Sequence, residues 1–322
     1  MKDQFDRNID YLRISITDRC NLRCRYCIPS DMGEGFTHFA HGDILQYEEF
    51  LRVAEIMAGL GVNTFRITGG EPLVRKEVAQ FVKNLKNLPS RPKVTLTTNG
   101  ILLSSQLPAL VDAGINGLNI SLDSASAINY ENITGQDQFA AVWESIKQAV
   151  AAGITVKLNT VIIQGINCHE IVDMVDLVKD FDISLRFIEL MPTGANTDLV
   201  GVPTRHIIDT IQGKYGQLTP ASTASPGPAQ YYTNPNIRGS IGTISPINHS
   251  FCQGCNRLRI SSTGFLRLCL HHNDGINLRD LLRTGATDDM IRDKIASTVT
   301  TKPREHLLDS HIAVQDMSKI GG

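Results

Sequence analysis

The sequence lacks a long apolar run. No stretch of its 322 residues approaches the roughly 18 consecutive apolar residues that a membrane-spanning helix requires. The opening residues, MKDQFDRNIDYLRISITDRC, are charged throughout and lack the apolar core of a signal peptide. We therefore expect a cytoplasmic protein with no membrane partner.

The sequence also lacks an excess of either charge. Lys and Arg total 31 against 33 for Asp and Glu, which gives a formal net charge of −2. Without a basic balance the chain offers no general surface for a polyanion, so we expect no nucleic-acid partner and only local anion recognition. With 42% hydrophobic and 20% charged residues, the composition is that of a globular protein rather than a disordered one.

Apolar, β-branched stretches alternate with stretches of helical periodicity over the first two thirds of the chain. Six of the former predict strands: YLRISI (11–16), NTFRIT (63–68), KVTLTT (93–98), GLNISLD (117–123), TVKLNTVII (155–163) and SLRFIEL (184–190). Five of the latter predict helices: 48–61, 76–88, 106–115, 139–153 and 169–181. This order predicts a parallel sheet, either doubly wound or part of a (β/α) barrel.

A segment rich in Pro, Ser, Thr and Gly follows, from about Gln217 to Ile237. We place the main boundary or a long loop there. The predicted organisation is a first part over 1–217 and a second part over 218–322, which begins with this linker and carries three cysteines.

Seven cysteines in a cytosolic chain are poor candidates for disulfides, because the cytosol keeps thiols reduced. Their spacing indicates metal ligands instead. Six form two groups of three, which are Cys20, Cys24 and Cys27, and then Cys252, Cys255 and Cys269. Cys168 stands alone, and we interpret it as a non-ligand.

The first group directly follows the first predicted strand. A [4Fe–4S] cube takes four ligands, so three closely spaced thiolates leave one iron free to bind a small molecule. A structural zinc site completed by His38 or His41 is the alternative, although the three-residue spacing between Cys20 and Cys24 argues against it. Electron-carrying ferredoxins use other spacings and have a fourth cysteine.

The second group also has three thiols without an obvious fourth, which favours a second cluster with an open iron. The alternative is a zinc ribbon with a histidine ligand from the nearby His249, His271 or His272. Arg257 and Arg259 follow the CxxC pair, and on a strand they share one face. Paired guanidiniums beside an open iron suit an anionic or purine ligand, whereas elsewhere they would indicate a solvated strand face.

The segment CNLRCRYC resembles the CxxxCxxC motif of the radical S-adenosylmethionine (SAM) superfamily. The resemblance implies that the open iron of the first cluster binds SAM. Four positions match SAM contacts of that superfamily: Tyr26, Gly70 in ITGGEP, Ser121 in NISLDS and Met191 in FIELMP. Taken alone, Tyr26 would also suit packing, and the glycine pair would suit an ordinary turn between strand and helix.

A larger set of motifs resembles the molybdenum cofactor biosynthesis protein A family, the GTP 3′,8-cyclases. The set, in chain order, is TDRCNLRCRYC, FRITGGEPLVR, LTTNG, LNISLDS, ITGQDQF, RFIELMPTG, GTISPI, FCQGCNRLR and the terminal IGG. It implies an incomplete (β/α)6 TIM-type barrel of the radical SAM type, closed by a C-terminal iron–sulfur segment. The implied cofactors are two [4Fe–4S] clusters and SAM.

The resemblance implies that the chain cyclises GTP to 3′,8-cyclo-7,8-dihydro-GTP, the first step of molybdenum cofactor biosynthesis. The matching substrate contacts are Arg13, Arg66, Thr97, Lys157, Arg186, Arg257 and Arg259. Catalytic roles fall on Arg257, Arg259 and the diglycine tail, Gly321 and Gly322, which would otherwise be a frayed end.

A physical argument supports these substrate contacts. A net-acidic protein must gather cations locally to bind a triphosphate, and a charge inside an apolar strand is costly unless it is paired. The alternative for each cation is an internal salt bridge to Glu71, Asp123 or Glu189.

The resemblance also implies partners. It predicts an electron donor such as a flavodoxin or ferredoxin system, a downstream cyclic pyranopterin monophosphate synthase, and it allows a homodimer. Two other functions stay open from the residues alone. One is a radical SAM peptide-modifying enzyme with an auxiliary cluster, and the other is a non-catalytic zinc and nucleotide-binding protein.

Overall fold

A computed structural model of the chain describes residues 1–27, 38–191, 198–221, 227–247 and 251–306. Its centre is a curved sheet of parallel strands that follow one another in chain order. These strands are β1 (Tyr11–Ser15), β2 (Thr64–Thr68), β3 (Lys93–Thr98), β4 (Gly117–Ser121), β5 (Val156–Ile162) and β6 (Ile183–Glu189). All six predicted strands are therefore confirmed.

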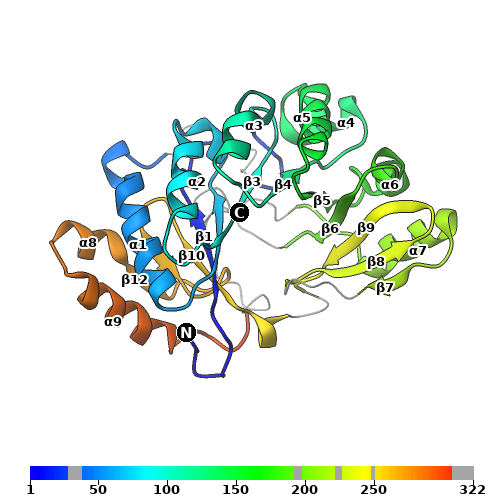
Figure 1. Cartoon of the computed structure of the whole chain (residues 1–322). Helices are drawn as coiled ribbons and strands as arrows, with labels where there is room; N and C mark the ends of the chain where they lie inside the picture. Colours follow the sequence, from blue (N-terminus) through cyan, green and yellow to red (C-terminus); the bar gives the residue numbers. More distant parts are fainter. Residues whose placement is uncertain (28–37, 192–197, 222–226, 248–250, 307–322) are drawn as a thin grey trace.

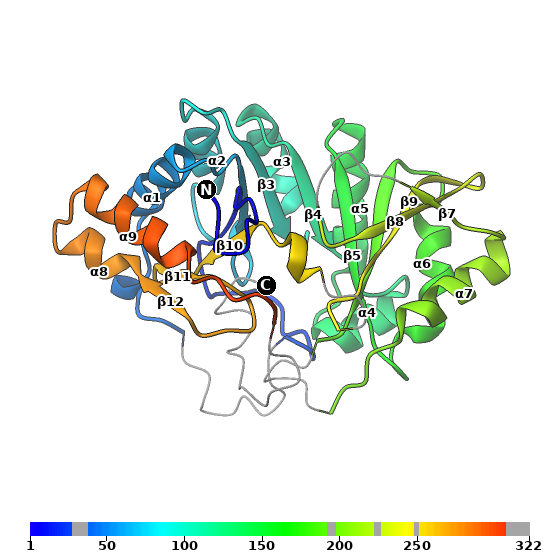
Figure 2. The same cartoon turned by 90° about the horizontal axis from the view of Figure 1, so that it is seen from below.

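Helices between these strands cover the outer side of the arc (Figure 1 and Figure 2). The five predicted helices are confirmed as α1 (Tyr47–Gly59), α2 (Val78–Lys86), α3 (Leu103–Asp112), α5 (Phe139–Ala151) and α6 (Ile171–Val178). The sequence prediction missed α4 (Ala127–Thr134), a short helix with little amphipathic pattern that ends at Gly135 with a φ of 79°.

The sheet extends beyond both ends of the six-stranded arc. On one side β10 (Arg257–Ile260) pairs in parallel with β1, followed by the antiparallel β11 (Phe265–Arg267) and β12 (Gly275–Asn277). On the other side β9 (Ile237–Ile244) pairs in parallel with β6, followed by the antiparallel β8 (Gln230–Asn234) and β7 (Thr219–Ala221). In the described chain the sheet ends at β12 and β7 without closing, so the expected incomplete barrel is confirmed.

The expected linker contains strands of this same sheet. β7 and β8 lie within the segment from Gln217 to Ile237, and they continue the sheet from β9. Proline and serine between the two strands hid their short β pattern. The predicted division of the chain at residue 217 is a separate matter and stays a prediction.

The remaining elements are short or lie at the ends of the sheet. They are α7 (Thr204–Tyr215), α8 (Leu278–Arg283), α9 (Asp288–Val299) and the 3-10 helices η1 (His41–Asp43), η2 (Pro72–Val74), η3 (Cys168–Glu170) and η4 (Cys252–Gly254). Within the described residues, no helix has the length and apolar character needed to cross a bilayer.

The strands divide their residues strictly between two faces. On β1, Leu12 and Ile14 are buried in the apolar core beneath the helices, while Tyr11 and Arg13 line the inner side. On β2 the same alternation places Phe65 outside and Arg66 inside. Because side chains along a strand point to opposite faces in turn, the inner side of the arc collects the polar residues.

Candidate active site

A cavity of about 610 Å³ lies on the inner side of the arc. It brings together every predicted site residue that the structure describes: Arg13, Cys20, Cys24, Tyr26, Cys27, Arg66, Gly70, Thr97, Ser121, Lys157, Arg186, Met191, Cys252, Cys255, Arg257, Arg259 and Cys269. Gly321 and Gly322 lie outside the described residues. Both cysteine groups and the strand cations therefore line one cavity, while their roles stay a prediction.

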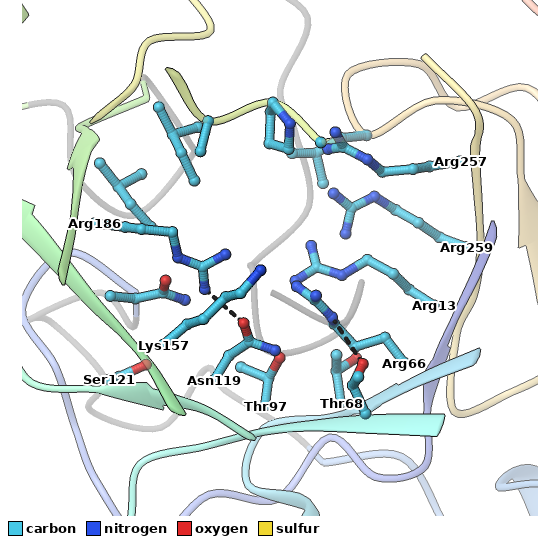
Figure 3. A pocket seen from close by; sticks show the side chains of 18 of the residues that line it. Arg13, Arg66, Thr68, Thr97, Asn119, Ser121, Lys157, Arg186, Arg257 and Arg259 are labelled. Atoms are coloured by element: carbon cyan, nitrogen blue, oxygen red, sulfur yellow. Dashed lines mark hydrogen bonds between the residues drawn. The ribbon is translucent and has the colours of Figure 1, made fainter. Parts of the chain in front are cut away.

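The predicted substrate contacts come from neighbouring strands in register. Arg13 of β1 lies opposite Arg259 of β10 on one side and Arg66 of β2 on the other. Lys157 of β5 lies opposite Asn119 of β4, and Arg186 of β6 follows on the next strand. Figure 3 shows these cationic side chains pointing into the same space.

Among the described residues no carboxylate forms an ion pair with Arg13, Arg66, Lys157, Arg186 or Arg257. Arg186 donates a hydrogen bond to Asn119 Oδ1 over 2.6 Å, and Arg66 Nε donates to Thr95 Oγ1 over 3.3 Å. The guanidinium of Arg257 lies 5.1 Å from the centre of the Phe251 ring. All of these partners are neutral, so within the described protein they leave the positive charges of Arg186, Arg66 and Arg257 without a negative partner.

Two of the three carboxylates considered as internal partners, Glu71 and Asp123, accept hydrogen bonds from neutral groups instead, while Glu189 accepts one from Ile247 N over 3.0 Å. Glu71 accepts hydrogen bonds from Leu73 N, Asn99 N and Thr98 Oγ1. Asp123 accepts from Tyr26 Oη over 2.7 Å and from Val161 N over 2.8 Å. Burial raises the pKa of Glu71 to about 7 and that of Asp123 to about 6. Neither carboxylate neutralises the strand cations.

Burial and mutual repulsion lower the pKa of the cations. Burial, followed by Arg259 and Arg66, lowers the pKa of Arg13 well below its usual value. Burial lowers the pKa of both Arg186 and Arg259 to about 10, and burial with Arg186 and Arg66 nearby lowers that of Lys157 to about 8. A bound anion would reverse these effects, because it stabilises the charged forms.

Several buried polar atoms of the cavity find no hydrogen-bond partner among the described residues. They are Arg13 Nε, Arg186 Nε, Thr97 Oγ1 and Asn159 Oδ1. Buried polar groups are nearly always satisfied in proteins. Two unsatisfied guanidinium donors and two further polar atoms around one cavity therefore indicate a polar ligand with acceptor atoms.

The first cysteine group lies beyond the carboxyl end of β1, on a loop held by α4. Arg23 N donates to Thr134 O and Arg25 N to Ile133 O, each over 3.0 Å. The helix that sequence reasoning missed therefore positions the CNLRCRYC loop. The motif ITGQDQF contained that signal, since Thr134 is the last residue of α4.

Predicted SAM contacts surround this loop. The backbone of Gly70 packs so closely on the loop that a Cβ atom there would lie 2.4 Å from Arg19 O. Tyr26 is fixed by its bond to Asp123. Ser121 is the last residue of β4, and Met191 lies just past β6. All four border the cavity at the carboxyl ends of the strands.

The second cysteine group lies near the opposite end of β1. Cys252 and Cys255 immediately precede β10, whose Arg257 pairs with Tyr11, the first residue of β1. A five-residue strand spans roughly 16 Å at about 3.3 Å per residue. The two groups therefore approach the cavity from opposite ends, with the cationic side chains between them.

The donor sets fit iron–sulfur clusters. All six cysteines are half-buried, line the cavity and take part in no disulfide among the described residues. Burial raises the pKa of Cys24 well above its usual value, and Asp123, Cys27 and Cys20 raise it further. Thiolates gathered in this way need cationic iron to stabilise them. Within the described residues no three His, Cys, Asp or Glu side chains enclose one ion, but in a cube each thiolate binds a different iron.

Of the histidines considered as zinc ligands, His38, His41 and His272 have other polar partners, whereas Nδ1 of His271 has no hydrogen-bond partner among the described residues. His38 Nδ1 lies 3.3 Å from Asp18 Oδ2, and His41 Nε2 lies 2.9 Å from Arg19 Nη2. His272 Nε2 lies 3.0 Å from Glu305 O. The ring of His271 packs against that of His306, and His249 lies outside the described residues.

Sequence reasoning missed several residues of the cavity. Asn119 could have been found, because it is a polar residue at an inward position of an apolar strand. Tyr231 lies in the segment taken as a linker, and Lys157 Nζ lies 5.8 Å from the centre of its ring. Lys302 also borders the cavity, and no local pattern marks it.

Comparisons with known proteins agree with this geometry. A family model of the Radical SAM superfamily matches residues 14–178, and one described as Molybdenum Cofactor Synthesis C matches 183–308. The GTP 3′,8-cyclase of Pelotomaculum thermopropionicum is 43% identical over 328 residues, covering 100% of both chains. That of Moorella thermoacetica is 42% identical over 326 residues, again covering 100% of both chains.

Among solved structures, SuiB of Streptococcus suis bound to S-adenosylmethionine has a TM-score of 0.65, with 15% identity. The match covers 88% of this chain and 68% of SuiB. At this identity the likeness shows the shared fold alone. Identity of about 40% to the cyclases over the full chain shows the family as well as the fold. The chain belongs to the GTP 3′,8-cyclase family within the radical SAM superfamily.

Proposed function

We propose that this chain converts GTP to 3′,8-cyclo-7,8-dihydro-GTP, the first step of molybdenum cofactor biosynthesis. As a radical SAM protein it uses SAM and a [4Fe–4S] cluster. The observation that carries the proposal is the cluster of cationic side chains between two cysteine triads in one cavity. A nucleoside triphosphate supplies the anionic oxygens that such a surface requires.

Separate parts of the cavity take separate parts of the ligands. We assign Cys20, Cys24 and Cys27 to the first cluster and Cys252, Cys255 and Cys269 to a second cluster. We assign SAM to Tyr26, Gly70, Ser121 and Met191 at the carboxyl ends of the strands. When bound, SAM and the first cluster supply a 5′-deoxyadenosyl radical that removes a hydrogen atom from the substrate.

The strand residues hold GTP between the two clusters. Arg13, Arg66, Thr97, Lys157 and Arg186 contact its phosphates and ribose, and Arg257 and Arg259 hold the guanine end beside the second cluster. Arg257 and Arg259 also act in catalysis, together with the diglycine tail. The buried guanidiniums fix the ribose in one orientation, and the surrounding strands exclude water from it.

The proposal extends to partners. The reducing electron comes from a flavodoxin-like or ferredoxin-like donor, and the product passes to a cyclic pyranopterin monophosphate synthase. We propose a cytoplasmic location, a homodimer, and a functional division near residue 217 between the SAM-cleaving barrel and the second-cluster region.

The direct test uses GTP labelled with deuterium at the ribose 3′ position. Anaerobically reconstituted, reduced protein with SAM should yield deuterated 5′-deoxyadenosine and a cyclised nucleotide. ATP labelled at the same position is the matched control, and it should transfer little deuterium. Formation of 5′-deoxyadenosine at the same rate without GTP, and no cyclised nucleotide, would overturn the proposal.

A further inference from the structure

Of the buried cations outside the set of predicted substrate contacts, two contact the backbone beside the second cysteine group. Lys302 follows α9 and is only 2% exposed, and Arg7 precedes β1 and is 7% exposed. A buried lysine is rare in proteins unless its ammonium group has acceptors or an opposite charge. The contacts of these two side chains converge on the second cysteine group.

Lys302 joins two separate segments of that group. Its Nζ donates a hydrogen bond to Leu268 O and, over 3.0 Å, to Arg257 O. Leu268 immediately precedes Cys269, and Arg257 is two residues after Cys255. One ammonium group therefore links the backbones beside two cysteines that are far apart in the sequence.

Arg7 holds the third cysteine. Its Nη1 donates to Cys252 O and to Arg304 O, each over 2.9 Å, and its Nη2 donates to Pro303 O over 2.6 Å. The segment after α9 is thereby tied to Cys252. Together the two cations contact the backbone at or near every cysteine of the group.

Arg7 and Lys302 differ in whether a carboxylate balances their positive charge. Arg7 forms an ion pair with the buried Asp3. Lys302 donates only to neutral carbonyls, and it has no ion pair among the described residues. Its ammonium group lies beside the backbones next to Cys255 and Cys269, and its side chain borders the same cavity as the three thiols.

We propose that Lys302 is a positioning residue for the second cluster. Its hydrogen bonds hold the backbones that carry Cys255 and Cys269, and its charge stabilises the reduced, more negative state of the cluster. Charge and hydrogen bonding around a cluster are the means by which a protein sets its reduction potential. This inference rests on the second cluster of the proposed function.

The test compares three variants of the full chain. Lys302→Met keeps the length of the side chain but removes the charge and the donor. Lys302→Gln removes the charge but keeps a donor, on a side chain one atom shorter. Lys294→Met, on the exposed face of α9, is the matched control for loss of one lysine. Iron and sulfide content reports cluster binding, and potentiometric EPR in a Cys24→Ser background reports the second cluster alone.

We expect Lys302→Met to lose iron from the second cluster. Lys302→Gln should retain the cluster with a lower midpoint potential, and Lys294→Met should match the wild type. If Lys302→Met does not fold, as judged by circular dichroism, the midpoint potential of the second cluster in Lys302→Gln, compared with that in the wild type, tests the proposal. If the wild type holds two clusters and both Lys302 variants retain the iron content and the midpoint potential of the wild type, the role of Lys302 is overturned. The second cluster itself would stand. A wild type with a single cluster overturns the second cluster as well.

Discussion

Arg13 and Arg259 lie directly opposite each other on the neighbouring strands β1 and β10, with their side chains on the same face of the sheet. Arg66 lies opposite Arg13 on its other side. Like charges placed side by side in a sheet are destabilising, so these strands keep an unfavourable arrangement in the absence of a ligand. A bound polyanion would relieve it.

Arg13→Met should separate stability from binding. We expect the ligand-free variant to unfold at a higher temperature than the wild type, because repulsion and an unsatisfied buried Nε are both removed. GTP affinity should fall roughly 10- to 150-fold, since hydrogen bonds to charged groups contribute about 1.5 to 3 kcal/mol. Calorimetry of unfolding and of GTP binding measures both, with the exposed Lys83→Met as control. Unchanged affinity would remove Arg13 from the substrate site.

GTP binding should weaken as the pH rises through 8. The pKa of Lys157 is about 8 because of burial and the nearby Arg186 and Arg66, so the group loses its charge above that pH. In the ligand-free protein, the effect of Lys157 on stability against unfolding has the opposite dependence on pH. Between about pH 8 and 10.5 the unfolded chain binds more protons at Lys157, so this residue makes stability rise with pH.

Titration of GTP affinity between pH 7 and 9 measures the effect of Lys157. Lys157→Met should bind GTP more weakly at pH 7, and its affinity should vary less with pH. An equally steep decline in Lys157→Met would show that another group titrates.

The two cysteine groups should lose iron independently. A chain with two cubes holds about 8 iron atoms, so Cys24→Ser and Cys255→Ser should each retain about 4. Cys168→Ser is the control and should retain about 8, because Cys168 lies outside the cavity lining.

Cys24→Ser should abolish SAM cleavage, whereas Arg257→Ala should weaken GTP binding with all iron retained. Equal loss of iron in Cys24→Ser and Arg257→Ala would contradict this division.

Gly70→Ala should displace the first cysteine loop. The added Cβ would lie 2.4 Å from Arg19 O, a backbone atom that cannot yield without moving Cys20. Such overpacking typically costs about 1 to 3 kcal/mol. Gly59→Ala, in the last turn of α1 with no atom within 4 Å of the new Cβ, should instead stabilise by up to about 1 kcal/mol. Chemical denaturation measures the free energy of unfolding of the two variants, and iron analysis measures their cluster content. If both variants change alike, the close contact at Gly70 is not the cause of the change.

Tyr26→Phe should destabilise the same loop in a different way. It leaves Asp123 Oδ2 without the phenol donor, and loss of a buried hydrogen bond costs about 1 to 3 kcal/mol. The pKa of Asp123 should rise further, because burial raises it and the bond from Tyr26 lowers it. Tyr130→Phe is the matched control, since that buried hydroxyl has no hydrogen-bond partner among the described residues. Denaturant unfolding should show a loss for Tyr26→Phe that Tyr130→Phe does not share.

Where sequence reasoning failed, the missing information was non-local. The strands β7 and β8 were taken as a linker because each is short and proline lies between them, and only pairing with β9 makes them part of the sheet. The short helix α4 has too few apolar positions to be seen as a helix, yet it holds the first cysteine loop.

The sequence by itself determined the six central strands, the inward direction of Arg13, Arg66, Lys157 and Arg186, and the grouping of the cysteines. Each of these follows from alternation or spacing within a few residues. Only the tertiary structure decided that the two cysteine groups lie at opposite ends of β1, and that Lys302 reaches the second. Those relationships depend on the parallel pairing of β10 with β1, which joins segments more than two hundred residues apart, and no local pattern encodes a contact at that separation.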